Sequence, residues 1–263
     1  MSVGLNVAGR AEYSPEELAA TGAKWLRCVA YPFAGIRWWI DRCHDLDMKV
    51  LMVLARESIG DDPLMWADNM RIFLVQYPVV DAWQVGNESD HASDSSWTLT
   101  QAQLNNLLIA ARVAMPHAYL VGPGLVSGQP PWAEPVNWSP VDALALHPYA
   151  KEPNTPELDD LIDGYAAFGK PLWATEFHSH TRGMATYLGH HQRIAVATAF
   201  CYSDGMVPGF GIKEDPGAWA DFLSATAGQQ PAPAPRPTPV PAPSPQPAPE
   251  PATGWIGDGL KEA

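Results

Sequence analysis

The chain has 263 residues, 46% of them hydrophobic, and its 11 tryptophans add to a composition that supports one large core. A formal net charge of −13 and a pI near 4.9 indicate an acidic surface. Such a surface repels phosphate backbones and anionic lipids, so we expect neither nucleic acid nor a membrane as a partner. A neutral carbohydrate is compatible with this charge.

The cysteines and the N-terminus give little sign of an exported protein. Cys28, Cys43 and Cys201 are odd in number and include no CxxC pair, which predicts no disulfide framework. The opening "MSVGLNVAGR" shows no basic segment followed by an apolar one, and no run of about 18 apolar residues suggests a membrane span. The location stays open between the cytoplasm and release onto a cell wall.

From residue 1 to residue 228, short apolar runs alternate with helical patterns, which is typical of βα units around a parallel sheet. Helix starts are indicated at Ser14-Pro15-Glu16-Glu17, Asp62-Pro63, Thr100 and Thr155-Pro156. We predict strands near residues 3–8, 24–30, 48–54, 80–86, 118–123, 142–147, 171–176 and 206–211. This order predicts an α/β fold, a compact (β/α)8 TIM barrel, for residues 1–228.

The composition changes abruptly after this domain. Between Pro231 and Pro251, proline occupies every second position, so the backbone lacks most of its hydrogen-bond donors. We predict that residues 229–251 form an extended, semi-rigid linker in the polyproline II conformation. Residues 252–263 are too few to fold alone and are either a simple terminus or the start of an additional module.

Two glutamates follow predicted strands at the same end of the barrel. Glu88 comes directly after the fourth strand in "AWQVGNESD", and Glu176 ends the seventh in "PLWATEFH". Barrel enzymes carry their catalytic groups at the carboxyl ends of the strands. A pair of carboxyl groups can cleave a glycosidic bond, one as the acid at the leaving oxygen and one facing the anomeric carbon. Glu88 and Glu176 are therefore the candidate catalytic residues.

Other polar residues belong to the same rim. Asn87 precedes Glu88, Arg27 lies in the second strand, and His147 and Tyr149 follow the sixth strand in "ALHPYA". For Arg27 the alternative is a solvated strand end. For His147 and Tyr149 the alternative is a packing role with satisfied polar tips.

Three of these segments resemble the motifs of a known group. "WQVGNE", "LHPY" and "LWATEFH" are similar to the strand-four, strand-six and strand-seven motifs of the clan A glycoside hydrolases, a large group of (β/α)8 glycosidases. The resemblance covers about residues 3 to 226. It implies a retaining mechanism without a cofactor, in which Glu88 is the general acid/base and Glu176 the nucleophile of a covalent glycosyl-enzyme intermediate.

The same resemblance implies roles for the neighbouring residues. Asn87 would hydrogen-bond the 2-hydroxyl of the sugar, Tyr149 or His147 would orient the nucleophile, and Arg27 would lie beneath it and keep it ionised. The clan usually has a tryptophan after strand eight as a sugar platform. Here that region reads "PGFGIKED", which leaves Phe210 as the candidate substitute.

Further candidates for substrate contact are aromatic. Most tryptophans of a barrel serve packing, but Trp132 and Trp138 lie in the long segment "SGQPPWAEPVNWSP" after the fifth strand. Each is either a sugar contact or a packing residue. His178 follows the nucleophile's neighbour and is a candidate for the cleft. We expect no metal, because the His-x-His that metal-dependent barrel hydrolases carry on strand one is replaced here by "VGLNVAG".

Taken together, these features predict a retaining glycoside hydrolase that acts on a polysaccharide or oligosaccharide. One alternative keeps the chemistry and changes the target, namely a phage-type lytic glycosidase acting on bacterial cell-wall polysaccharide. A second alternative is a barrel that only binds carbohydrate or serves as a structural appendage. A binding barrel has no need for both glutamates, which favours the enzyme.

Overall fold

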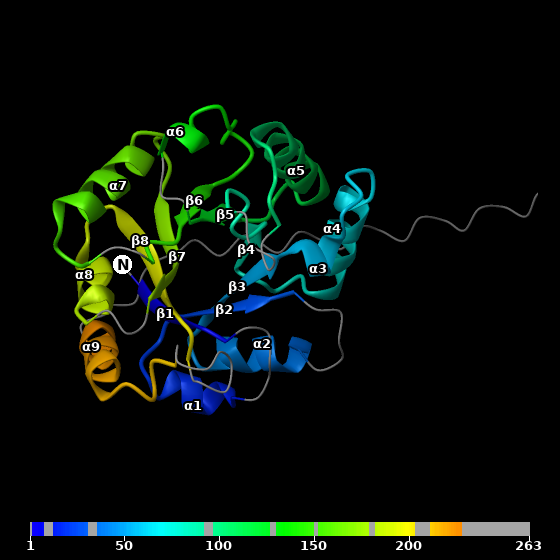
Figure 1. The fold of residues 1–263 in the computed structure, drawn as a ribbon. Coiled ribbons are helices and arrows are strands. Elements are labelled where there is room, and N and C mark those ends of the chain that lie inside the picture. Colours follow the sequence, from blue (N-terminus) through cyan, green and yellow to red (C-terminus); the bar gives the residue numbers. More distant parts are fainter. Residues whose placement is uncertain are drawn as a thin grey trace, which may run out of the picture.

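The computed structural model describes residues 2–7, 13–30, 36–91, 97–126, 130–149, 152–178, 182–202 and 211–227. Eight parallel strands pair in chain order, and β8 returns to β1, so the sheet closes into a barrel with the helices outside it (Figure 1). The predicted (β/α)8 TIM barrel is confirmed. The predicted linker and tail lie outside the described residues.

The strands are short and almost completely buried, as expected for a sheet that is covered on both faces. They are β1 (Ser2–Asn6), β2 (Trp25–Val29), β3 (Lys49–Leu54), β4 (Ala82–Val85), β5 (Leu120–Leu125), β6 (Ala143–Leu146), β7 (Leu172–His178) and β8 (Ile194–Phe200). The helices are α1 (Pro15–Ala19), α2 (Ile36–Asp45), α3 (Arg56–Ile59), α4 (Trp66–Gln76), α5 (Gln101–Ala114), α6 (Pro130–Ala133), α7 (Pro156–Ala166), α8 (Met184–His190) and α9 (Pro216–Ala227).

The prediction of the eighth strand is wrong. The strand that closes the barrel is β8 at Ile194–Phe200, which pairs with β7 on one side and β1 on the other. Its sequence "IAVATAF" contains three alanines, a residue that is depleted in strands, so its local composition is a weak signal. Closure of the sheet determines its conformation. Of the segment predicted instead, residues 206–210 lie outside the described residues.

The predicted helix starts are largely confirmed. The side chain of Ser14 accepts a hydrogen bond from the Glu17 amide, and Thr100 forms a complete capping box with Gln103. Thr155 is the N-cap of α7, although its hydroxyl makes no capping bond. At Asp62-Pro63 a turn comes first, and α4 begins at Trp66. None of the helices in the described part of the chain is long and apolar enough to cross a membrane.

The apolar residues form two separate clusters. The larger one fills the space between the sheet and the helices. The smaller one, which we call the interior cluster, lies inside the barrel and consists of Trp25, Leu51, Ala82, Val121, Ala143, Ala145, Trp173 and Val196. The interior of the barrel is therefore packed with side chains near the starts of the strands, so a ligand site belongs at the other end.

Candidate active site

The backbone after β4 turns so that Glu88 faces the barrel mouth. Gly86 has a φ of 82° and Glu88 a φ of 50°, so both adopt left-handed conformations. Such a conformation is uncommon for a glutamate and needs support from the surroundings. The Glu88 amide donates a hydrogen bond of 2.9 Å to the carbonyl oxygen of Gly124 on β5. The strand end is thus anchored to its neighbour, and the carboxyl group is aimed into the rim.

A β-bulge in β7 presents two consecutive side chains to the same site. Between Ala174 and Phe177 the strand advances three residues while β8 advances two. The extra residue breaks the strict alternation of inward and outward side chains. Phe177 packs into the outer apolar cluster, whereas Thr175 and Glu176 both contact polar residues of the rim.

Arg27 is the centre of the polar contacts. It is 2% exposed, and its guanidinium reaches three partners from two other strands and the turn after one of them. Its Nη1 forms an ion pair with Oε1 of Glu176, Nη2 donates to Oδ1 of Asn87 at 2.6 Å, and Nε donates to Oε1 of Gln84 at 3.0 Å. A buried arginine of this kind keeps its partner carboxylate charged.

Glu176 is held as an anion by the groups around it. Arg27 bonds one carboxylate oxygen and the hydroxyl of Tyr149 donates to the other. Burial acts to raise the pKa of Glu176, but the charge of Arg27 and these hydrogen bonds outweigh it and lower the pKa below 4.5. Burial and the neighbouring carboxylate raise the pKa of Tyr149, so its hydroxyl stays a donor.

His147 contacts the other glutamate. Its Nδ1 lies 3.2 Å from Oε1 of Glu88 and 3.8 Å from Oε2 of Glu176, and its Nε2 lies 3.1 Å from Oγ1 of Thr175. The resemblance left open whether Tyr149 or His147 orients Glu176. In the structure Tyr149 makes that direct bond, and His147 bonds Glu88.

The two glutamates differ in their surroundings although they are close together. The Glu88 side chain is 18% exposed, whereas that of Glu176 is 6% exposed and bonded on both oxygens. One carboxylate oxygen from each, together with a nitrogen of His147, lie within 4.8 Å of one another. Below, "rim network" means the set Arg27, Gln84, Asn87, Glu88, His147, Tyr149, Thr175 and Glu176.

Within the described residues, Glu88, His147 and Glu176 are the one group of potential ligand side chains that is close enough to hold a metal ion. The charge of Arg27 beside Glu176 opposes a cation at this position. His190 and His191 line a different cavity, described below. The rim therefore fits an uncharged substrate better than a metal.

The two tryptophans predicted as candidates for substrate contact differ in their burial. Trp138 is 7% exposed, packs against Phe168 and donates its indole hydrogen to the carbonyl oxygen of Ala133. Its ring is thus mostly packed against residues outside the barrel, and its contact with substrate stays a prediction. Trp132 on α6 is half-buried against the same core, and its contact with substrate stays a prediction.

Two further candidates lie near the ends of β7 and β8. His178 is the last residue of β7 and is half-buried. Phe210 lies outside the described residues. The aromatic residue that does end the eighth strand is Phe200, whose ring meets Tyr149 edge-on with centroids 5.9 Å apart. It was missed because the strand was assigned to the wrong segment.

Sequence reasoning also missed Gln84 and Thr175. Gln84 is fully buried in β4 and bonds Arg27, Asn87 and the carbonyl oxygen of Gly86. The signal was available, since a glutamine two residues after Ala82 occupies an inward position of a buried strand. Thr175 was missed because alternation counted from the predicted inward residue Glu176 places its neighbour on the outer face, and the β-bulge that lets both face inward is not visible in the sequence.

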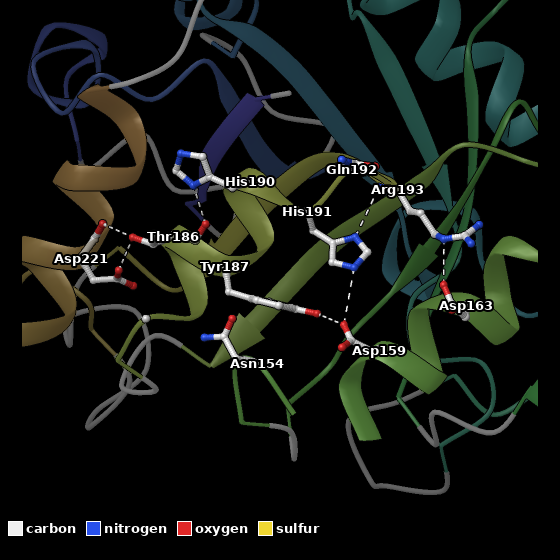
Figure 2. A pocket seen from close by; sticks show the side chains of 11 residues that line it. Asn154, Asp159, Asp163, Thr186, Tyr187, His190, His191, Gln192, Arg193 and Asp221 are labelled. Carbon is white, nitrogen blue, oxygen red and sulfur yellow. Dashed lines mark hydrogen bonds and ion pairs between the residues drawn. The ribbon is translucent and has the colours of Figure 1, made fainter. Parts of the chain in front are cut away.

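A separate cavity of about 810 Å³ lies on the outside of the barrel, between α7, α8 and α9 (Figure 2). No member of the rim network lines it. Its polar side chains largely satisfy one another, since Asp159 meets Tyr187 and His191, Asp163 meets Arg193, and Asp221 meets Thr186. We therefore place the functional site at the rim.

Comparison with known proteins supports the fold. No protein-family model and no curated protein sequence matches the chain. A GH128 endo-β-1,3-glucanase from Amycolatopsis mediterranei is similar in structure, with a TM-score of 0.61 and 14% identity over 85% of this chain and 98% of that chain. The catalytic domain of a mannanase from Streptomyces sp. SirexAA-E has a TM-score of 0.64 and 15% identity, covering 88% of each chain.

A third similar structure is a GH128 oligosaccharide-binding protein from Cryptococcus neoformans. Its TM-score is 0.56, with 15% identity over 86% of this chain and 94% of that chain. At these identities the likeness concerns the barrel itself, and it includes both hydrolases and a binding protein.

Proposed function

We propose that the protein is a retaining glycoside hydrolase that cleaves a poly- or oligosaccharide with Glu88 as acid/base and Glu176 as nucleophile. The observation that carries this proposal is the pair of glutamates at the rim, whose oxygens approach within 4.8 Å in two different environments. Retaining glycosidases hold their carboxyl groups about 5–5.5 Å apart, and inverting ones about 6.5–9.5 Å. An approach of one oxygen from each glutamate to within 4.8 Å favours the retaining arrangement.

The first step uses the difference between the two carboxyl groups. Glu176 is ionised by Arg27 and attacks the anomeric carbon, while the protonated Glu88 gives its proton to the leaving oxygen. The bond from the anomeric carbon to that oxygen breaks as the bond to Glu176 forms. Glu176 loses its negative charge as it forms the new bond, and Glu88 becomes a carboxylate when it gives up its proton.

In the second step Glu88 acts as a base instead of an acid. Its carboxylate takes a proton from water, and the oxygen of that water attacks the anomeric carbon. Glu176 leaves as a carboxylate, again stabilised by Arg27 and Tyr149. Two displacements at the same carbon return the original anomeric configuration.

Neighbouring side chains would hold the sugar. The oxygen of the Asn87 amide accepts hydrogen bonds from Arg27 and Gln84, which turns its amino group away from them and makes it a donor for a sugar hydroxyl. Phe200 takes the place at the end of β8 that we predicted for Phe210. Its half-buried ring beside Tyr149 would provide an apolar platform.

The comparisons support β-linked glucans and mannans as the first substrates to test, since the similar hydrolases carry the names glucanase and mannanase. They also keep a second candidate, a barrel that binds an oligosaccharide without cleaving it, because one similar structure is such a protein. The intact pair of glutamates favours the enzyme.

The test measures sugar release from β-1,3-glucan, mannan and purified bacterial cell walls. Wild type is compared with Glu88→Gln and Glu176→Gln, and Glu157→Gln on the exposed start of α7 serves as the control for a lost carboxylate. Proton NMR of the first product gives its anomeric configuration. We expect retention, and a loss of at least about a thousandfold in both rim variants but not in the control.

Four outcomes separate the candidates. Activity on cell walls alone would assign the lytic function, and inversion of configuration would contradict the retaining mechanism. Saccharide binding by wild type, seen in calorimetry without any sugar release, would favour the binding barrel. Activity that survives in Glu88→Gln and Glu176→Gln would refute the assignment of the two glutamates.

A further inference from the structure

The imidazole of His147 is clamped between two hydrogen-bonding groups in a fully buried position. Its side chain is 0% exposed. Nδ1 faces Oε1 of Glu88 at 3.2 Å, and Nε2 faces the hydroxyl of Thr175 at 3.1 Å. A neutral imidazole carries one ring hydrogen, so these two contacts determine which nitrogen holds it.

The space for this ring is created by a glycine. A Cβ atom at Gly124 would lie 1.8 Å from Nε2 of His147 and 2.4 Å from both adjacent ring carbons. The carbonyl oxygen of Gly124 also accepts the hydrogen bond from the Glu88 amide. The same residue therefore fixes the backbone of Glu88 and the ring that contacts its carboxyl group.

Thr175 is equally well fixed. It lies two residues after the inward-facing Trp173 and beside Glu176, which the β-bulge in β7 allows to face the same side, and it is fully buried. Its carbonyl oxygen accepts a hydrogen bond of 2.5 Å from the hydroxyl of Thr198 on β8. With its backbone held in this way, its own hydroxyl points at Nε2 of His147.

Electrostatics select the direction of both bonds. Nδ1 faces Oε1 of Glu88 at 3.2 Å and Oε2 of the anionic Glu176 at 3.8 Å. A lone pair on Nδ1 would be repelled by the charge of Glu176, whereas a hydrogen there is attracted. The hydrogen therefore belongs on Nδ1, and the hydroxyl of Thr175 donates to the lone pair of Nε2.

We infer that Thr175 is a positioning residue that sets the tautomer of His147 and, through it, the oxygen of Glu88 that carries the catalytic proton. Because Nδ1 donates to Oε1, the proton of the acid form sits on Oε2, the oxygen left for the glycosidic bond. Without the Thr175 donor, His147 can carry its hydrogen on Nε2 and accept a hydrogen bond at Nδ1 from a protonated Oε1 of Glu88. The acid would then aim its proton at the histidine.

This inference rests on the proposed function, but its first test does not need activity. Ring-nitrogen NMR of histidine-labelled protein, assigned with His147→Gln, reports the tautomer directly. We expect His147 to be neutral with its hydrogen on Nδ1 in wild type, and to lose this preference in Thr175→Val. A wild-type ring that is protonated, or that carries its hydrogen on Nε2, would overturn the inference even if no variant folds.

The second test compares kcat/KM for two aryl glycosides of the sugar that the wild type releases. A dinitrophenyl leaving group departs without a proton, whereas a phenyl leaving group needs one. For Thr175→Val we expect a fall of roughly tenfold for the phenyl glycoside, the value of one hydrogen bond, and almost none for the dinitrophenyl glycoside. Thr175→Ser keeps the hydroxyl and should have the wild-type kcat/KM for both glycosides.

Thr226→Val is the matched control, because it removes a buried threonine hydroxyl from α9, away from the rim. Its ratio of the two kcat/KM values should equal that of wild type. Equal losses on both glycosides in Thr175→Val, with the tautomer unchanged, would reduce Thr175 to a structural residue. A wild type that hydrolyses nothing would remove the proposed function, while the NMR result would still decide the tautomer.

Discussion

The two ends of the barrel interior are built by the same strands and have opposite chemistry. Near the strand starts, Trp25 and Trp173 pack edge to face, with ring centroids 4.8 Å apart, inside the interior cluster. Two residues further along the same strands come Arg27 and Thr175, which belong to the rim network. Along the inward-facing positions of each strand, the apolar residue of the interior cluster is therefore followed directly by a residue of the rim network.

The contacts inside the interior cluster stabilise the fold, whereas those of the rim network belong to the proposed active site. The interior cluster gains free energy by removing aromatic surface from water, a contribution that does not depend on direction. The rim network buries charges, and this is tolerated because Arg27, Glu176 and Tyr149 satisfy one another. Substitutions at the two ends should therefore separate stability from activity.

The largest effect should come from Arg27→Met. It leaves the buried carboxylate of Glu176 without its counterion, so we expect a loss of about 3–5 kcal/mol in the free energy of unfolding and no detectable hydrolysis. Urea unfolding at neutral pH measures the first quantity. The double variant Arg27→Met/Glu176→Gln should recover most of the stability and none of the activity, because both partners are gone.

Arg27→Lys separates the effect of the positive charge from that of the hydrogen bonds. It keeps the positive charge but loses the planar guanidinium, whose three nitrogens bond Gln84, Glu176 and Asn87 at the same time. Its stability should lie between those of wild type and Arg27→Met. If Arg27→Met unfolds at the wild-type urea concentration, the ion pair does not hold Glu176 as an anion.

At the other end, Trp173→Ala should change stability alone. It opens a cavity in the interior cluster, and removing a buried aromatic ring costs about 3–5 kcal/mol. The kcat per folded molecule should stay at the wild-type value at a temperature where the variant remains folded. A fall in kcat without a fall in stability would mean that the two ends of the barrel are coupled.

The sequence predicted the fold and the location of the site from features that are local. Apolar runs revealed seven strands, and the rule that barrel sites lie at the carboxyl ends brought Arg27, Glu88, His147, Tyr149 and Glu176 to one rim. The structure places these five side chains in contact as one network. Their catalytic roles remain a proposal.

What the sequence did not reveal depends on closure and on irregular backbone. The alanine-rich β8 becomes a strand because it lies between β7 and β1. The bulge that lets the adjacent residues Thr175 and Glu176 both face inward is a property of the pairing between strands, which strand alternation does not record. Trp138 looked available in an isolated loop, but it bonds the carbonyl oxygen of Ala133 on α6 and packs against Phe168 after the end of α7.

Tyr149→Phe should lower activity with little effect on stability. It removes the hydrogen bond to Oε2 of Glu176, and a bond to a charged group contributes about 1.5–3 kcal/mol, so kcat/KM should fall roughly tenfold to a hundredfold. Tyr165→Phe is the matched control, since within the described structure the buried Tyr165 hydroxyl has no hydrogen-bond partner. Its removal should leave activity unchanged and stability equal or slightly higher.

The smallest effect concerns the pH dependence of stability. Burial acts to raise the pKa of Glu176, but Arg27 and Tyr149 lower it below 4.5 in the folded protein. A lowered pKa means that the unfolded chain binds the proton more readily, so this carboxylate stabilises the fold above about pH 4.5 and ceases to do so as the pH falls through its folded-state pKa.

Urea midpoints measured from neutral pH down to about pH 3 test this dependence, and one titrating group contributes at most about 1.4 kcal/mol per pH unit. Wild type should lose stability more steeply below pH 4.5 than the double variant Arg27→Met/Glu176→Gln, in which this group no longer titrates. Carboxylates elsewhere are present in both proteins, so they cancel in the difference. Parallel curves would mean that the pKa of Glu176 does not differ between the folded and unfolded states, so Arg27 and Tyr149 would not stabilise its charged form.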